Sequence, residues 1–242
     1  LAVFDNTALW VHEVTLDGHH RLFRLLQGFT NRFVVNVYSV NNTMKNWFPS
    51  ASLLEIPYKH LNNISSNEKA RIKERYKACM VVRPIRNKGI DKFFEIAINN
   101  KHDLFAILTQ EIQFREFCDE NNLDIPANVS IKRFDNLQDR ENVILSSAFH
   151  LNLSELPETV GLNSIEAISY GCIALSTDNM GSRMILDERF IAKSSSVKDI
   201  LACLTSFFGE DLIEISATQK RRIFSKDSAN NQDTLLHRLG VL

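Results

Sequence analysis

The sequence predicts an α/β protein with two domains, each built around a parallel β-sheet. Apolar segments typical of buried strands alternate with amphipathic segments typical of helices, at intervals of roughly 20–30 residues. This alternation favours parallel strands joined by crossover helices. With 242 residues, of which 44% are apolar and 24% charged, the chain can bury a sizeable core. A polar segment over residues 61–67 marks a linker and divides the chain into residues 1–62 and 63–242.

The overall composition excludes several classes of protein. The formal net charge is −1, so the chain has no global basic field and nucleic acid is not expected as a partner. No apolar run approaches the roughly 18 residues that a membrane-spanning helix needs. The first residues, 1–4, are typical of the middle of a domain, which leaves open that the chain is a fragment. The four cysteines are far apart in the sequence and are expected to be reduced thiols of a cytoplasmic protein: Cys79, Cys118, Cys172 and Cys203.

The first domain, residues 1–62, contains three expected strands. They lie over residues 8–14, 33–40 and 52–56. An amphipathic helix is expected between the first two strands, over residues 18–29, because leucines and a phenylalanine recur there on one face. A short helix or turn is expected after the second strand, at residues 41–47. Three strand units are fewer than a complete doubly wound domain contains, so this domain is expected to be incomplete.

The second domain, residues 63–242, continues the alternation. A capping box at residues 65–68 opens a helix that is expected to run to about residue 77. A Gly-containing turn is expected at Met180-Gly181, and alternating residues over 129–134 predict a strand at an exposed edge. Further strands are expected over residues 79–82, 104–108, 149–153, 172–176 and 190–192. Helices are expected over residues 90–99, 111–121, 137–147, 163–170, 197–208, 211–224 and 233–239.

Two carboxylates, Glu158 and Glu166, lie eight residues apart around the start of one expected helix. Glu166 is expected in the first turn of the helix over residues 163–170. A carboxylate at the end of a strand–loop–helix unit can accept two hydrogen bonds from the vicinal diol of a ribose, each worth roughly 1.5–3 kcal/mol when desolvated. The alternative is that both glutamates only complement the helix dipole on a solvated face.

The backbone amides at the start of the same helix belong to Val160, Gly161 and Leu162. Free N–H groups and the helix dipole make such a terminus favourable for a phosphate group. Gly161 has no side chain, so the backbone can approach a phosphate closely there. The stretch is therefore a candidate phosphate site.

A basic loop carries Arg83, Arg86 and Lys88 between an expected strand and an expected helix. Loops at the carboxyl ends of parallel strands face the crevice in which doubly wound sheets bind ligands. Arginine can grip a phosphate with two hydrogen bonds, and lysine supplies a point charge. Taken alone, the loop is also typical of an ordinary solvated turn. Together with the acidic loop on the same sheet edge, it describes a site for a nucleoside diphosphate-sugar.

Residues 78–186 resemble the C-terminal nucleotide-binding domain of GT-B glycosyltransferases, close to the retaining family 4 type. In that family a strand is followed by the motif G-R-x-x-x-x-K-G. The chain matches this motif from Arg83 to Gly89, with Val82 in place of the first glycine. The resemblance implies two Rossmann-like domains, of which the N-terminal one is incomplete here.

Two further motifs of the family follow. The pattern S-x-x-E-x-F-G-L-x-x-x-E-A is matched at Glu158, Gly161-Leu162 and Glu166-Ala167. Residues 171–177 fit the pattern G-x-P-V-[IV]-[AS]-[ST] at Gly171, Ser176 and Thr177, with Ile173 in place of its proline. The three motifs occur in the family's order, which makes their combination fairly specific.

The resemblance implies a role for each matched residue. Arg83 and Lys88 would bind the donor diphosphate together with the amides of residues 160–162. Glu166 would bind the ribose diol. Glu158 would lie near the donor sugar and its phosphate, which makes it a catalytic candidate.

The histidines add a second catalytic candidate, His12. The family often places a strand-end histidine in the cleft near the acceptor and the donor sugar, and His12 lies near the end of an apolar strand. The alternative for His12 is a packed or surface histidine. His150 interrupts a strand and is expected in the core or at a sheet edge. The spacing of the His and Cys residues forms no metal-ligand set, so no metal is expected.

The chain departs from the family at several positions. Val160 replaces a phenylalanine and Ile173 replaces a proline. Met180 stands where the first glycine of a Gly-Gly pair is usual, Met184 stands where a glutamate is expected, and residues 109–111 replace a glycine-rich turn. These departures leave room for a non-catalytic sugar-nucleotide-binding or scaffold subunit. A sugar-nucleotide epimerase of the same two-domain shape is a remoter alternative.

The expected function is a glycosyltransferase of the hexosyltransferase type that acts in glycan or polysaccharide synthesis with retention at the anomeric carbon. The expected donor is a UDP-sugar or a GDP-sugar, with no further cofactor. The acceptor is a hydroxyl of a glycan, a lipid-linked molecule or a protein. The expected compartment is the cytoplasm, with peripheral contact at the inner face of the membrane left open.

Overall fold

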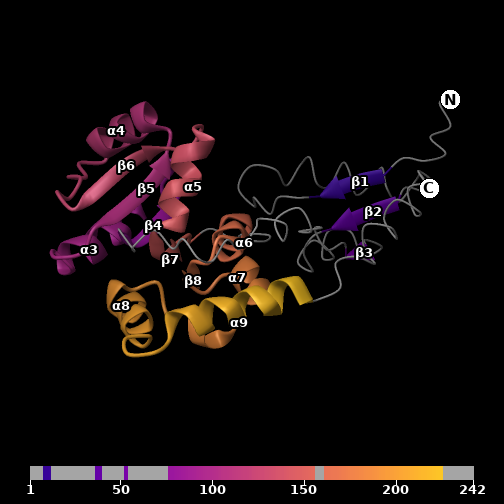
Figure 1. Ribbon diagram of the computed structural model, residues 1–242. Coiled ribbons are helices and arrows are strands. Elements are labelled where there is room, and N and C mark those ends of the chain that lie inside the picture. Colours follow the sequence, from indigo (N-terminus) through magenta and orange to yellow (C-terminus); the bar gives the residue numbers. More distant parts are fainter. Residues whose placement is uncertain (1–7, 12–35, 40–51, 54–75, 156–160, 226–242) are drawn as a thin grey trace, which may run out of the picture.

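The computed structural model of the protein describes residues 8–11, 36–39, 52–53, 76–155 and 161–225 (Figure 1). Its larger part is a parallel sheet of five strands with helices packed against it. The strands are β4 (Tyr76–Val81), β5 (Phe105–Thr109), β6 (Val129–Arg133), β7 (Ser147–Asn152) and β8 (Ile173–Ser176).

Strand β4 is the centre of this sheet, whose order is β6-β5-β4-β7-β8. The chain moves outward from β4 through β5 to β6 and then returns to place β7 on the other side of β4. Ala78 pairs with Phe105 of β5 on one side and with Phe149 of β7 on the other. The strand order therefore reverses between β4 and β7, which is where doubly wound sheets open a ligand crevice. Strand β6 lies at one edge, as its alternating pattern predicts.

The helices of this part lie between the strands and after them. They are α3 (Ile90–Asn99), α4 (Glu111–Glu120), α5 (Leu137–Leu145), α6 (Leu162–Ser169), α7 (Met180–Ile185), α8 (Val197–Thr205) and α9 (Leu212–Ser225), with a 3₁₀ turn η3 at Glu188–Phe190. Helix α5 begins after Asn136, whose side chain accepts a hydrogen bond from the backbone N–H of Asp139. Helix α8 begins in the same way after Ser196, which explains why polar residues start both helices.

Three short strands form a second parallel sheet in the first part of the chain. They are β1 (Ala8–Val11), β2 (Asn36–Ser39) and β3 (Ser52–Leu53), in the order β1-β2-β3. They confirm the parallel strands predicted there. The helix predicted over 18–29, the turn over 41–47, the linker at 61–67 and the last helix over 233–239 lie outside the described residues.

Three sequence predictions for the second domain are wrong. The helix expected to reach residue 77 cannot do so, because β4 already begins at Tyr76 and its N–H donates to the carbonyl of Ser146. The turn expected at Met180-Gly181 is the start of α7, because the Asn179 side chain caps a helix there. The strand expected over 190–192 is reduced to one bridge between Ser176 and Ile191 beside η3.

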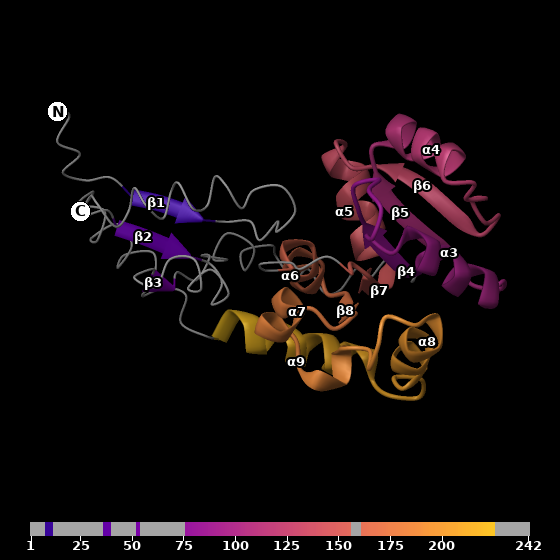
Figure 2. The ribbon, with the colours of Figure 1, turned by 180° about the vertical axis from the view of Figure 1, so that it is seen from behind.

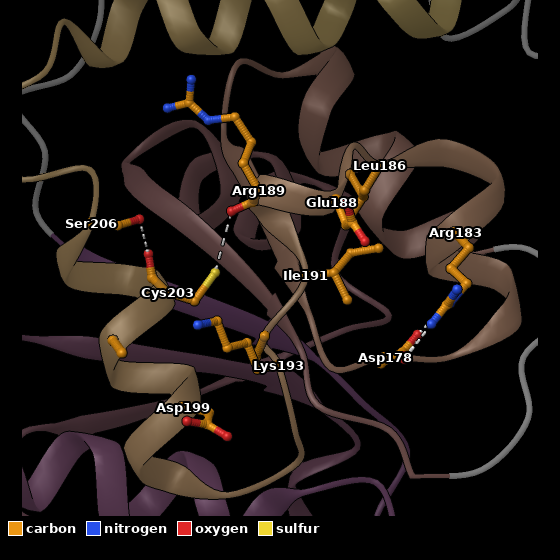
Figure 3. A pocket seen from close by; sticks show the side chains of 12 residues that line it. Asp178, Arg183, Leu186, Glu188, Arg189, Ile191, Lys193, Asp199, Cys203 and Ser206 are labelled. Atoms are coloured by element: carbon orange, nitrogen blue, oxygen red, sulfur yellow. Dashed lines mark hydrogen bonds and ion pairs between the residues drawn. The ribbon is translucent and has the colours of Figure 1, made fainter.

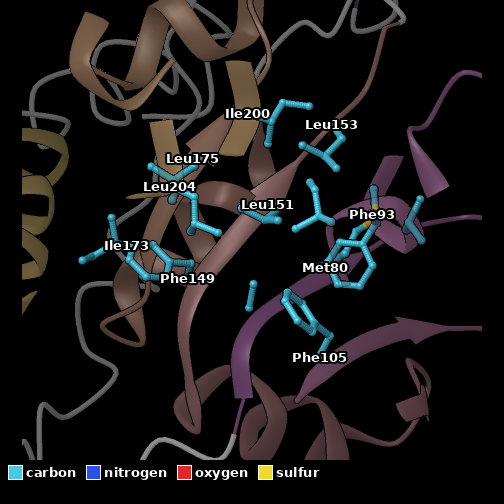
Figure 4. Close-up of a cluster of buried hydrophobic side chains, with 14 of the residues drawn as sticks. Met80, Phe93, Phe105, Phe149, Leu151, Leu153, Ile173, Leu175, Ile200 and Leu204 are labelled. Atoms are coloured by element: carbon cyan, nitrogen blue, oxygen red, sulfur yellow. The ribbon is translucent and has the colours of Figure 1, made fainter. Parts of the chain in front are cut away.

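Phenylalanines fill the core between the sheet and its helices (Figure 4). The rings of Phe93 in α3 and Phe105 in β5 meet edge to face with centroids 5.7 Å apart. Phe149 of β7 packs against Phe207, which in turn stacks on Phe190 at 5.3 Å. These five rings are all buried, and the four cysteines are free thiols as predicted.

Helix α9 completes the outer edge of the sheet, where it runs beside β8 in both overall views (Figures 1 and 2). The buried side chain of Gln219 accepts a hydrogen bond from the Ala174 N–H and donates one to the Ala174 carbonyl, both at 3.0 Å. A side-chain amide thus takes the place of a neighbouring strand. The edge strand β8 is therefore closed by α9 at this point.

Replacing Gln219 with methionine should lower the free energy of unfolding by about 2 kcal/mol. The methionine side chain has a similar length but leaves a buried N–H and a buried carbonyl without partners. Urea unfolding followed by circular dichroism measures this change. Gln138→Met, which removes an exposed bond to Asn142, is the matched control and should change stability by less than about 0.5 kcal/mol. Equal effects in the two variants would contradict the role of Gln219.

Candidate functional site

The basic loop after β4 and the loop after β7 touch at the carboxyl edge of the sheet. They are brought together because β4 and β7 are neighbouring strands. The backbone N–H of Glu155 donates to the carbonyl of Asn87 at 2.8 Å. The Lys88 ammonium donates to the hydroxyl of Ser154 at 3.3 Å, and Lys92 forms an ion pair with Glu155. The two loops therefore form one continuous surface.

This contact depends on Gly89, the last residue of the basic loop. Gly89 has a φ of 74°, in the left-handed region that glycine adopts most readily. A Cβ atom at this position would lie 2.5 Å from both the Cβ and the carbonyl oxygen of Leu153. The loops can approach each other only where no side chain separates them. The sequence predicts Gly89 as a motif residue, but only the packing shows what it does.

The three cations of the basic loop have different surroundings. Arg86 donates to the side chain of Asn121, away from the second loop, and Lys88 is held by the buried Ser154. Arg83 is exposed directly after β4 and forms no ion pair with any residue that the structure describes. Arg83 and Lys88 thus lie on the edge that was predicted for them, and Arg86 is directed to α4.

Helix α6 begins beside these loops with Gly161 as its N-cap. Gly161 is buried and has no side chain, so it offers no side-chain cap to the first N–H groups of α6. Leu162 follows with 41% of its surface exposed. The side chain of Asn163 donates to the carbonyl of Val81 at 3.2 Å and ties α6 to the end of β4. Val160 lies outside the described residues.

Glu166 lies in the second turn of α6, not in the first turn as expected. The helix begins earlier than predicted, at Leu162, and its first turn contains no acidic residue. Glu166 is buried, with 8% of its surface exposed, and it forms an ion pair with Arg140 of α5. A carboxylate in this position is not a solvated partner of the helix dipole. Ile165 and Ile168 beside it are fully buried.

Several polar residues at this edge were not identified from the sequence. Arg140 belongs to no motif, and Ser154 and Asn163 are tied to this edge by the contacts described above. The hydroxyl of Thr109, at the end of β5, is buried without a hydrogen-bond partner among the described residues. None of these residues stands out by type or spacing, because their partners are far away in the sequence.

The two catalytic candidates, Glu158 and His12, lie outside the described residues. His150 is buried in β7, which confirms its place in the core. Burial lowers the pKa of His150 from 6.5 to about 4, because the protonated ring would lose its hydration. Neither ring nitrogen has a hydrogen-bond partner among the described residues.

A separate pocket of about 970 Å³ lies between α7, η3 and α8 (Figure 3). On one side of it, the Arg183 guanidinium donates two hydrogen bonds to the Asp178 carboxylate, each 2.6 Å long. Cys203 lines the other side, and burial raises the pKa of its thiol to about 11. Of the residues predicted to bind the donor, none that the structure describes lines this pocket. It is therefore distinct from the edge formed by the two loops.

Two further properties concern only the described part of the chain. It contains no group of three or more His, Cys, Asp or Glu residues arranged to hold a metal ion. Among its helices, none combines the length and the apolar character needed to cross a membrane.

Comparison with known proteins identifies the fold. No protein-family model and no curated protein matches the sequence. Among solved structures, Anabaena Alr3699/HepE in complex with UDP and glucose matches with a TM-score of 0.75 and 12% identity, over 97% of this chain and 71% of that one. Sucrose-phosphate synthase from Thermosynechococcus elongatus matches with a TM-score of 0.69 and 12% identity, over 98% of this chain and 68% of that one.

TarM matches with a TM-score of 0.71 and 12% identity, over 96% of this chain and 50% of that one. The fold is that of the GT-B glycosyltransferases. This confirms the predicted α/β class with parallel sheets. The chain spans half the length of TarM, and at these identities the likeness concerns the fold.

Proposed function

We propose that the chain is part of a glycosyltransferase that moves a sugar from a nucleoside diphosphate-sugar to an acceptor hydroxyl. The observation that carries this proposal is the contact between the basic loop and the loop after β7, beside the open N-terminus of α6. Cations, free amides and a buried carboxylate are thereby gathered at the point where strand order reverses. The GT-B fold supports it, as does the presence of UDP in the structure of HepE.

Each group at the edge has a role in this proposal. Arg83, Lys88 and the amides that open α6 would bind the diphosphate and stabilise its charge as it leaves the sugar. Glu166 would accept hydrogen bonds from the ribose hydroxyls. Glu158 and His12 would act near the donor sugar. Closure of the cleft would exclude water from the reaction.

The finer features of the activity belong to the same proposal. Transfer is of a hexosyl group with retention, in the synthesis of a glycan or polysaccharide. The donor is a UDP-sugar or a GDP-sugar, and the acceptor is a glycan, lipid-linked or protein hydroxyl. Protein cations take the role that a metal would have at the diphosphate. The proposed place of action is the cytoplasm, with peripheral contact at the membrane.

Arg83→Ala and Glu166→Ala should each weaken the binding of UDP or GDP by about tenfold or more. Each variant removes a charge-assisted hydrogen bond to the nucleotide, and tenfold corresponds to about 1.4 kcal/mol. Isothermal titration calorimetry on the full chain measures the affinity. Arg115→Ala, which removes an exposed arginine paired with Glu111 on α4, is the control and should leave binding unchanged. If both site variants bind as the wild type does, the proposed site is wrong.

A non-catalytic sugar-nucleotide-binding or scaffold subunit is the second candidate function. The observation in its favour is that Met180 and Met184 both belong to α7, the segment in which the resembled family places residues that hold the donor sugar. Incubation of the full chain with labelled UDP-sugars and GDP-sugars separates the two functions. A transferase releases free nucleotide, whereas a scaffold binds the donor without turnover.

A further inference from the structure

The described partner of the Glu166 carboxylate is an arginine from another helix. The Arg140 guanidinium, on α5, donates through Nη2 to Oε1 of Glu166 on α6. No other hydrogen bond to this carboxylate exists among the described residues. The second carboxylate oxygen, Oε2, does not occur among the described residues' buried side-chain atoms that lack a hydrogen-bond partner. One oxygen is therefore taken by Arg140, and the other is left with solvent access.

The Arg140–Glu166 pair is much less exposed than the other arginine–carboxylate pairs of the described residues. The side chains of Arg140 and Glu166 are 26% and 11% exposed, whereas those of Arg115 and Glu111 are 56% and 40% exposed. Exposed pairs contribute little to stability, because water and salt screen them. A pair this sheltered holds its groups in one geometry, because breaking it would leave a charge poorly solvated.

One aromatic ring supports the guanidinium itself. The central carbon of Arg140 lies 4.8 Å from the centre of the Phe134 ring, so the ring supports the planar group from one side. The Nε atom of Arg140 is buried and has no hydrogen-bond partner among the described residues. The Phe134 ring thus supports the plane of the guanidinium, which donates to Glu166 through Nη2. Lysine could supply the charge but not this planar fork.

We infer that Arg140 is a positioning residue for Glu166 and that the pair selects a ribonucleotide over its 2′-deoxy counterpart. Arg140 holds one carboxylate oxygen, so that the other is aimed at the ribose hydroxyls of the donor. This inference rests on the proposed function, because it assumes that a nucleotide binds at this edge. A purely structural pair between α5 and α6 would stabilise the fold but would not affect the choice of sugar in the nucleotide.

The test compares ligands that differ only at the ribose or lack it. The full chain is titrated calorimetrically with UDP, 2′-deoxy-UDP, GDP, 2′-deoxy-GDP and inorganic pyrophosphate. The wild type should bind the preferred ribonucleotide about tenfold more tightly than its 2′-deoxy form, as expected for one hydrogen bond to a carboxylate. Arg140→Met should reduce this preference to about twofold or less, while the affinity for pyrophosphate stays within about twofold.

Two further variants complete the experiment. Arg115→Met is the matched control and should keep the full preference, because its partner Glu111 lies on α4. Arg140→Lys keeps the charge without the planar fork, so the preference should fall below about fivefold. This variant decides the question alone if Arg140→Met does not fold by circular dichroism.

Each contrary outcome has a separate meaning. If the Arg140 variants keep the wild-type preference, Arg140 does not position Glu166 and the proposed function stands. If the wild type binds the ribonucleotide and its 2′-deoxy form equally, the pair does not select the ribose and the inference fails. If the wild type binds neither UDP nor GDP, the proposed function fails and the inference fails with it.

Discussion

Replacing Gly89 with alanine should lower the free energy of unfolding by about 4 kcal/mol. About 1 kcal/mol comes from the left-handed φ of 74°, which alanine adopts only at a cost. About 3 kcal/mol comes from overpacking, because the new methyl group would lie 2.5 Å from the Leu153 backbone, and backbone atoms cannot move aside as the end of a flexible side chain can. Urea unfolding followed by circular dichroism measures the loss.

Gly209→Ala is the matched control for this variant. Gly209 also has a left-handed φ, of 87°, but no atom lies within 4 Å of the Cβ that alanine would add. Its substitution should therefore cost only the conformational part, about 1 kcal/mol. A similar cost for the two substitutions would show that the loop contact at Leu153 does not require a glycine.

Acidification should destabilise the protein through His150, by about 2 kcal/mol at pH 5 and about 3 kcal/mol at pH 4 relative to pH 7.5. Burial lowers the pKa of His150 in the folded state to about 4, against 6.5 for the exposed ring of the unfolded chain. The unfolded state therefore binds more protons between these two values. The contribution of His150 to stability is complete above pH 6.5 and declines as the pH falls towards 4.

His150→Leu isolates this effect from all other titrating groups. The difference in unfolding free energy between the wild type and the variant should change by the amounts above, because the other groups contribute equally to both proteins. At pH 7.5 the variant should be at least as stable as the wild type, since leucine removes two buried nitrogens without partners. Parallel stability curves for the two proteins from pH 7.5 to pH 4 would contradict the prediction.

Local patterns were sufficient to predict most elements of the five-stranded sheet and its helices. Helix α3 has the predicted bounds, 90–99, because its buried residues recur with the helical period, at Ile90, Phe93, Phe94 and Ala97. The prediction failed at Tyr76, where pairing with β7 overrides a local helix pattern. It also failed at Met180, where the Asn179 side chain accepts a hydrogen bond from the backbone N–H of Ser182 and caps a helix in place of the expected loop. Such choices depend on single contacts, which periodicity does not encode.

The candidate site divides in a similar way. Arg83, Lys88 and Gly161 were identifiable because each belongs to a motif of contiguous residues at a strand end or a helix start. Glu166 was also identifiable, but its burial and its partner were not. Arg140 is separated from Glu166 by 26 positions in the sequence and meets it only because α5 and α6 both pack on the same sheet.

The amino-acid pattern was thus enough to establish the class of fold, the order of its elements and the types of residue that could bind a phosphorylated ligand. Periodicity, turns and caps involve residues a few positions apart, so they can be recognised along the chain. Only the folded structure shows that β4 and β7 are neighbours, that Leu153 approaches Gly89 and that Arg140 pairs with Glu166. These contacts join residues distant in sequence, and they exist because packing brings the segments together.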